Sequence, residues 1–362
     1  LVGSEMCIRD RFVTLTFHDV RDDVAVNGDR DSYAISSKNL AQFLAWLKQS
    51  DWTVIRLEDV WQAREHNVAL PDKAVLLTFD DGALSSYSRV YPLLKQYQIP
   101  AVFAIVTSWI NGNNHDAYEA YGQGNLMNWQ QMREMENSHL VEFVSHSDNL
   151  HKGILANPQQ NMEPAAITRQ YLPAQQSYET DEVYHQRILN DLKKSKTILD
   201  QKLGINTKAI FWPYGAVTRE TEQLAKQAGL PISFSLGDVS VHESSIQTYQ
   251  RAIAMGNPVP EELHAQMLRF LEDIRRPSKN RRSLIAIDPT DFVNADGTLD
   301  DKKFGQMLEQ LASLKTNAII FKVVVDQDQD GKIDGAFFPT QLLPYHQDVL
   351  NRMIWQARTR IG

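Results

Sequence analysis

The sequence is poor in cysteine and in positive charge. Cys7 is the single cysteine among 362 residues, so the chain has no intramolecular disulfide and no paired-thiol chemistry. Lys and Arg number 37 against 45 Asp and Glu, which gives a formal net charge of −8. Because a nucleic-acid binder neutralises phosphates with basic patches, and none stands out here, the composition argues against a nucleic-acid partner.

The first eleven residues, LVGSEMCIRDR, lack both an apolar signal-peptide core and a strand period. They resemble translated adapter sequence at the end of an assembled gene, and we expect residues 1–11 to be non-native and exclude them from fold reasoning. Lipidation at Cys7 is disfavoured because Met6 is too large for the preceding position. We expect any true signal peptide or lipidation site to lie upstream.

The rest of the chain has the composition of a globular protein, with 43% hydrophobic and 23% charged residues. Its length predicts two domains. Strand and helix patterns alternate from residue 12 onward, which predicts a parallel α/β fold, most simply a distorted (β/α) barrel. We expect this domain to span residues 12–273, followed by a basic linker at 274–282 and a second domain at 283–362.

The most informative stretch is AVLLTFDDG, residues 74–82. Its apolar run predicts a buried parallel strand that ends at two adjacent carboxylates, Asp80 and Asp81. Neighbouring strand residues point to opposite sides, but Gly82 supplies a turn that allows one carboxylate to bind a metal while the other remains a free base. In isolation, a DD pair before glycine is more often a turn or a helix cap.

A second apolar run, residues 140–144, leads into SHSDNLH, which contains His146 and His151. Two imidazoles separated by four residues can converge on one ion if the segment curls as it leaves the strand, although such pairs are often surface histidines. An Asp with two His suits a catalytic zinc, because three protein ligands leave a position for water.

TFDDG, SHSDNLH and the later FWPYG resemble the first three motifs of the polysaccharide deacetylases, the NodB-homology family of carbohydrate esterases. The resemblance covers residues 12–270. It implies that Asp80 is the general base and that Asp81, His146 and His151 hold a divalent metal, expected to be zinc, with nickel or cobalt as alternatives.

Residues 12–17, FVTLTF, predict a strand that ends at His18 and Asp19. The family usually carries its catalytic-acid histidine in a late motif, and none is convincing here. In one branch, the periplasmic deacetylases of poly-β-1,6-N-acetyl-D-glucosamine, an FHDV-like motif opens a permuted barrel. His18 is therefore the expected acid, with His242 and His264 as alternatives.

The third motif lacks the arginine that orients the base in most family members, since Phe211 and Trp212 stand at those positions. The backbone N–H at Tyr214 is expected to help hold the oxyanion, and Trp212 and Asp19 are further candidates for substrate contact. An aromatic turn is the alternative interpretation of this motif. Arg251 could pair with a site carboxylate, but we expect a surface arginine.

Two long segments lack a clear period. Residues 108–124 predict a rim loop, and residues 151–182 predict an excursion over the barrel mouth.

The residues from 284 onward resemble the start of a second barrel, the C-terminal glycoside-hydrolase domain of the Gram-negative branch, broken off after about 80 residues. We expect it to have neither a closed core nor glycosidase activity alone. Its DQDQDG loop at 326–331 resembles a calcium loop, but Phe337 occupies the position of the required Glu.

The resemblance implies N-deacetylation of poly-β-1,6-N-acetyl-D-glucosamine in the periplasm or at the outer membrane, before export through a porin. Two alternatives remain open. The same residues could deacetylate chitin, peptidoglycan or xylan, or the domain could be a non-catalytic polysaccharide-binding module.

Overall fold

The computed structural model describes residues 12–25, 29–237, 248–275, 284–314, 316, 318–326, 330–344 and 348–361. These residues belong to two compact units. One comprises Leu1–Ile154 and Glu163–Ser278, and the other comprises Leu155–Met162 and Lys279–Gly362. Residues 1–11, most of the expected linker and His242 lie outside the described residues.

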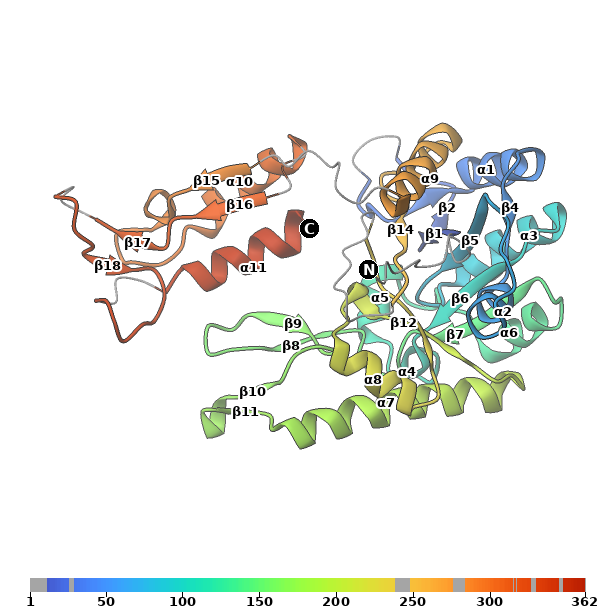
Figure 1. The fold of residues 1–362 in the computed structure, drawn as a ribbon, viewed down its shortest axis with the longest axis horizontal. Helices are drawn as coiled ribbons and strands as arrows, with labels where there is room; N and C mark the ends of the chain where they lie inside the picture. Colours follow the sequence, from blue (N-terminus) through green and yellow to red (C-terminus); the bar gives the residue numbers. More distant parts are fainter. Residues whose placement is uncertain are drawn as a thin grey trace, which may run out of the picture. The chain divides into compact units, whose positions relative to one another are not determined.

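A parallel sheet forms the first unit, and the predicted α/β class is confirmed (Figure 1). The strand order is β13-β12-β7-β6-β5-β1-β14, with β4 also paired to β5. The bounds are β1 Phe12–Phe17, β4 Thr53–Val54, β5 Ala74–Phe79, β6 Ala101–Ile105, β7 Val141–Ser145, β12 Ala209–Phe211, β13 Ile232–Phe234 and β14 Ala252–Ile253.

The two ends of this strand order meet at residues 249–253. Ala252 and Ile253 pair with β1, while Tyr249 forms a parallel bridge with Phe234 of β13. The N–H of Gly237 also donates to the carbonyl of Arg251 at 3.0 Å. The sheet therefore curves into a distorted barrel, and Arg251 lies in the segment that touches both ends.

Strand side chains alternate between two apolar layers. Val75, Leu77 and Phe79 of β5 pack outward with helices, whereas Ala74 and Leu76 pack in a second cluster inside the curved sheet. Helices α1 (Ser37–Gln49), α3 (Tyr91–Tyr97), α6 (Trp129–Glu136) and α9 (Pro260–Arg275) contribute to the outer layer. α2 (Leu57–His66) contributes Leu57 and Val60 to the inner cluster.

Several local elements differ from the sequence prediction. The helical segment between β5 and β6 begins as a π-helical turn, Ser86–Val90, and continues as α3. The expected rim loop contains two short helices, α4 (Thr107–Ile110) and α5 (His115–Tyr121). β4 has only two residues, and α9 continues past residue 273, the expected end of the first domain, to Arg275.

The irregular segment after His151 is not a single open loop. It forms two small hairpins, β8 (Gly153–Leu155) with β9 (Met162–Pro164), and β10 (Tyr171–Leu172) with β11 (Ser177–Tyr178). It then enters α7 (Asp181–Leu203), which Thr180 caps, and α8 (Arg219–Gln227) follows β12.

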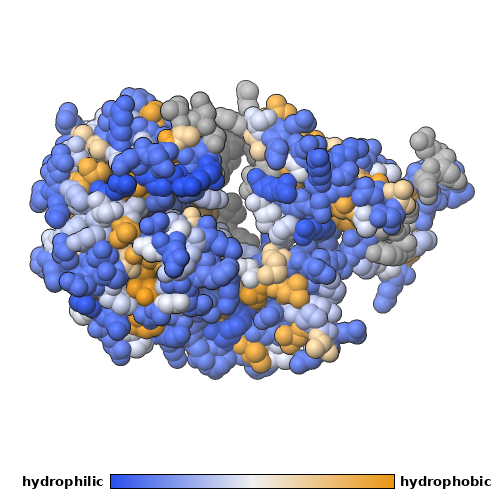
Figure 2. All heavy atoms as spheres, turned by 180° about the vertical axis from the view of Figure 1, so that it is seen from behind, coloured by the Kyte–Doolittle hydropathy of each residue, from blue (hydrophilic) through white to orange (hydrophobic). Residues whose placement is uncertain are grey.

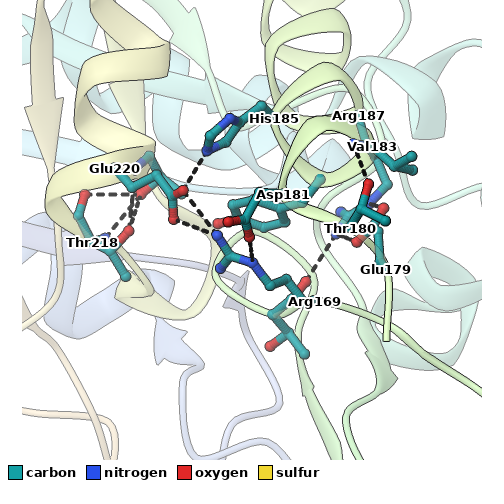
Figure 3. A network of polar contacts seen from close by, with 12 residues as sticks. Arg169, Glu179, Thr180, Asp181, Val183, His185, Arg187, Thr218 and Glu220 are labelled. Carbon is teal, nitrogen blue, oxygen red and sulfur yellow. Dashed lines mark hydrogen bonds and ion pairs between the residues drawn. The ribbon is translucent and has the colours of Figure 1, made fainter. Parts of the chain in front are cut away.

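Ion pairs fasten this segment to α7 and α8 (Figure 3). Arg169 donates to Asp181 at 2.6 Å and to Glu220 at 2.9 Å, and His185 also bonds to Glu220. Arg187 donates to both oxygens of Glu179 at 2.8 Å. The charged residues Arg169 and Glu179 thus attach the part of the excursion after β9 to the helices of the first unit.

The second unit has strands β15 (Leu284–Ile287) and β16 (Ala318–Phe321), paired in parallel, and helices α10 (Asp301–Ser313) and α11 (Leu350–Ile361). A small antiparallel pair of strands, β17 (Val324–Val325) and β18 (Gly335–Ala336), follows β16 and precedes α11 in the sequence. Leu155–Met162 belongs to this unit: the indole of Trp355 donates to the carbonyl of Met162 at 2.6 Å.

The core of the second unit is small. Phe304, Leu308 and Met353 are among its buried residues, whereas Leu284 and Ile320 on the paired strands are 55% and 54% exposed. Phe337 is fully buried in this core. A buried phenyl ring offers no oxygen ligand, which argues against calcium binding in an EF-hand geometry.

The molecular face in Figure 2 is largely hydrophilic, with hydrophobic residues in scattered groups. Within the described ranges, no helix combines the length and the apolarity needed to cross a membrane.

Candidate metal and catalytic site

The two adjacent aspartates lie where β5 ends, and both are buried. Asp81 has a φ of 72° and Gly82 a φ of 85°, so the turn begins at Asp81 itself. The N–H of Asp80 still bonds to the carbonyl of Phe17 in β1 at 3.0 Å. Asp80 therefore keeps its place in the sheet while Asp81 turns toward other partners.

His146 and His151 face Asp81 from the end of β7. The Nε2 atoms of both histidines lie 3.3 Å from Asp81 Oδ1. His146 Nδ1 lies 2.6 Å from the carbonyl oxygen of Phe211, and a proton on Nδ1 would form a hydrogen bond to this oxygen. This contact leaves Nε2 with its lone pair, as a metal ligand requires.

These three residues fit a divalent metal ion. One donor atom from each lies within 4.8 Å of the others. Asp81 Oδ1 is buried and lacks a hydrogen-bond partner among the described residues. An unsatisfied buried carboxylate oxygen that faces two imidazole nitrogens is costly without a cation, and one carboxylate with two histidines is a zinc-type ligand set.

Two aspartates position the loop between the histidines. Asp191 of α7 accepts the N–H groups of Asp148 and Asn149, each at 2.8 Å. Asp148 in turn accepts the Thr107 hydroxyl and the Lys194 ammonium, each at 2.7 Å. Burial raises the pKa of Asp191 to about 6. Sequence reasoning missed Asp191, because its place in a helical pattern gives no sign of this contact.

Each of the three site loops contains a non-glycine residue in the left-handed backbone region. Asp81, Ser147 and Tyr214 all have positive φ values, of 72°, 72° and 57°. Non-glycine residues adopt this region at a cost of about 1–3 kcal/mol and do so most often at functional sites. The three loops are therefore shaped by their contacts rather than by local preference.

The expectation that Arg251 lies on the surface is wrong. Its side chain is fully buried, and Nη1 donates to both oxygens of Asp80, at 2.7 and 2.9 Å. Its guanidinium also stacks 4.4 Å from the ring centroid of Phe211. Arg251 thus gives Asp80 the arginine partner that the third motif does not supply. The apolar residues Ala252 and Ile253 directly after it were the available sign of burial.

The surroundings keep both carboxylates ionised. Burial alone would raise the pKa of Asp80, but the charges of Arg251, His146 and His18 lower it below the usual range. Burial also opposes ionisation of Asp81, yet contacts with His151 and His146 hold its pKa well below the usual range. Two adjacent ionised carboxylates favour the binding of a cation beside them.

His18 follows β1, whose pairing with β5 in the register Phe17–Phe79 places it beside Asp80. Its positive charge contributes to the lowered pKa of both aspartates. Its ring packs 5.3 Å from that of Tyr33, and Nδ1 is buried with no partner in the described part of the chain. Asp19 pairs instead with Arg21 at 3.3 Å and accepts the Ser85 hydroxyl at 2.7 Å. His264 packs between Trp46 and Trp52 on the outer layer.

Two aromatic residues of the third motif differ in exposure: Trp212 is buried and Tyr214 is exposed. Trp212 is fully buried in an apolar cluster with Ile188 and Leu192, so its side chain does not meet solvent, in contrast to the expected substrate contact. Tyr214 is 51% exposed, and its ring lies 4.6 Å from that of His151. Tyr214 is therefore the residue of this motif that borders the metal ligands.

Comparison with known proteins gives a consistent result. Residues 67–233 match the family described as polysaccharide deacetylase, and residues 286–362 match hypothetical glycosyl hydrolase family 13. The poly-beta-1,6-N-acetyl-D-glucosamine N-deacetylase of Escherichia coli K12 is 30% identical across the whole chain. The chain spans 53% of that relative's length.

Two solved structures are similar to most of this chain. The de-N-acetylase from Aggregatibacter actinomycetemcomitans is 30% identical with a TM-score of 0.62, and the match covers 70% of this chain and 99% of that one. The BpsB deacetylase domain from Bordetella bronchiseptica is 37% identical with a TM-score of 0.57, covering 67% and 95%. Fold, motif geometry and sequence agree, and the chain belongs to the polysaccharide deacetylase family.

Proposed function

We propose that this chain is a metal-dependent N-deacetylase of poly-β-1,6-N-acetyl-D-glucosamine. The observation that carries the proposal is the buried cluster of Asp81, His146 and His151 beside the Asp80–Arg251 pair. Similarity to relatives named for this substrate supports the choice of polymer.

In this proposal Asp81, His146 and His151 hold the ion, with zinc expected and nickel or cobalt as alternatives. When bound, the ion would polarise the N-acetyl carbonyl and lower the pKa of a water molecule. Asp80, held ionised by Arg251, accepts the proton of the attacking water. The backbone N–H of Tyr214 donates to the oxygen that gains charge.

His18 completes the reaction by donating a proton to the leaving amine nitrogen, because an unprotonated amine is a very poor leaving group. The C–N bond breaks, acetate departs and a glucosamine remains in the polymer. The buried Arg251 supports a catalytic domain over a non-catalytic binding module, since it supplies the base partner that the third motif lacks.

We further propose that the reaction occurs outside the cytoplasm, in the periplasm or at the outer membrane, on polymer destined for an export porin. The support is the polysaccharide named for the relatives. Residues 12–273 would form the deacetylase domain, and 283–362 a part of a glycoside-hydrolase-like barrel without activity by itself. Fractionation of cells that express the complete gene tests the location: recovery in the cytoplasm alone would contradict it.

The substrate assignment is tested by acetate release from the full chain. Oligomers of poly-β-1,6-N-acetyl-D-glucosamine, chitin, peptidoglycan fragments and acetylxylan would be compared as purified, after chelation and after zinc, cobalt or nickel is restored. We expect release from the β-1,6 oligomers that chelation abolishes and metal restores. Release from another polymer alone would replace the substrate, and metal binding without any release would favour a binding module.

A further inference from the structure

The two oxygens of Asp81 have different partners. Oδ1 faces His146 Nε2 and His151 Nε2, each at 3.3 Å. Oδ2 instead accepts a hydrogen bond from the hydroxyl group of Tyr121, at 2.5 Å. One side of the carboxylate is thus directed at the ion site, and the other is occupied by a phenol.

Tyr121 is the last residue of α5 and is fastened to the turn that follows Asp81. Its carbonyl accepts the Asn125 side-chain amide at 2.7 Å, and the Asn125 carbonyl accepts the N–H of Leu84 at 2.8 Å. The N–H of Met127 donates to the Gly82 carbonyl at 2.9 Å. The segment that carries the phenol and the turn that carries Asp81 are therefore held in fixed register.

The same segment also supports a second ligand. Tyr121 packs against a small buried cluster that contains Val106, Trp109 and Ala117. Trp109 in turn lies 4.8 Å from the His151 ring, centroid to centroid. The wall formed by α4 and α5 therefore contacts Asp81 through a hydrogen bond and His151 through an aromatic ring.

We propose that Tyr121 is a positioning residue that keeps Asp81 a one-oxygen metal ligand. A carboxylate can bind an ion through one oxygen or through both. Because Oδ2 is committed to the phenol, the ion receives Oδ1 alone, and a coordination position remains for water and substrate. This inference rests on the proposed function, in that it requires an ion on these three ligands.

The hydrogen bond also has an energetic role. Groups that bond to a metal ligand fix its orientation, and their loss typically weakens metal affinity about 10- to 100-fold. In the absence of the phenol, Asp81 can rotate about its side-chain bonds and offer both oxygens. Metal affinity and coordination number are therefore the properties that should respond to this residue.

The experiment compares Tyr121→Phe with Tyr118→Phe in the full chain. Both changes remove one hydroxyl from α5 and keep the ring, but the Tyr118 hydroxyl accepts from Asn114, not from the site. Zinc affinity would be measured by competition with a chromophoric chelator, and coordination by the visible absorption of the cobalt-loaded protein. Thermal melting of the metal-free variants checks that both fold.

We expect Tyr121→Phe to bind zinc about 10- to 100-fold more weakly. Its cobalt absorption should be weaker than that of the unchanged chain, as for a higher coordination number, and Tyr118→Phe should match the unchanged chain in both. An unchanged affinity and spectrum in a folded Tyr121→Phe would overturn the inference alone. Because neither readout uses substrate, failure of acetate release with intact zinc binding would count against the proposed reaction only.

Discussion

The guanidinium of Arg251 binds the carboxylate of Asp80 inside the barrel, with one nitrogen 2.7 and 2.9 Å from its two oxygens. The two residues are 171 positions apart in the chain. They meet because β14 pairs with β1, and β1 pairs with β5. Asp80 is thereby oriented by a residue that lies outside the three conspicuous motifs.

Arg251→Met should impair both activity and folding. Loss of one member of a buried ion pair leaves an uncompensated charge and costs about 3–5 kcal/mol of stability. Acetate release should fall by about 100-fold or more, because the base loses its orientation. Chemical denaturation and kinetics would be measured in parallel.

Arg251→Lys separates charge from geometry. The ammonium keeps the positive charge but loses the planar guanidinium, so stability should recover in part while kcat remains low. Arg269→Met on the exposed side of α9 is the matched control and should leave both unchanged. Full activity in Arg251→Met would show that Asp80 needs no such partner.

His18 should control kcat without affecting metal binding. His18→Ala removes the proposed proton donor, and kcat should fall by about 100- to 10,000-fold. Zinc affinity should stay within about twofold, because the three ligands lie on other strand ends.

His264→Ala is the contrasting variant. Since His264 packs against Trp46 and Trp52, its loss should lower the melting temperature but spare kcat. His242→Ala, at a position outside the described residues, should also keep kcat. A normal kcat in His18→Ala, with a large loss in either other variant, would move the acid to that histidine.

Most of the sheet follows from sequence patterns. Apolar runs at β1, β5, β6 and β7 are long enough to mark buried strands, and polar residues directly follow β1, β5 and β7. The convergence of Asp81, His146 and His151 was predictable because these residues lie at such ends. A strand of two residues, such as β4, is too short to show an alternation of apolar and polar residues, so its ends cannot be located from the sequence.

The supporting residues were much harder to predict. Arg251, Asp191 and Tyr121 act through single side-chain contacts across the fold, and no period or spacing signals such contacts. Arg251 was misassigned because arginine is most often exposed. The paired hairpins after His151 were hidden because each strand has only two or three residues.

A pH effect on stability is expected from Glu136, the last residue of α6. Burial, reinforced by the charge of Glu142, raises the pKa of Glu136 from 4.5 to about 7. As pH rises above 4.5, Glu136 ionises in the unfolded chain, whereas in the folded chain it keeps its proton up to about pH 7. The free energy of unfolding therefore decreases over this pH range. Stability should therefore fall from about pH 4.5 to about pH 7 and then level off with respect to this group.

The size of this effect is modest because Glu136 is partly exposed, and we expect about 1 kcal/mol after solvent screening. Glu136→Gln should flatten that part of the stability curve, as measured by denaturant unfolding at several pH values. Glu272→Gln, at an exposed site in α9, should not change the slope. An unaltered slope in Glu136→Gln would assign the pH dependence to other groups.

The most direct test of the account compares Asp80→Asn with Asp81→Asn in one experiment that measures both zinc content and acetate release. If Asp80 is the base and Asp81 a ligand, Asp80→Asn retains zinc but loses release by at least about 1,000-fold, whereas Asp81→Asn loses both. Substantial release by Asp80→Asn, or full zinc content in Asp81→Asn, would contradict the division of roles between the two adjacent carboxylates.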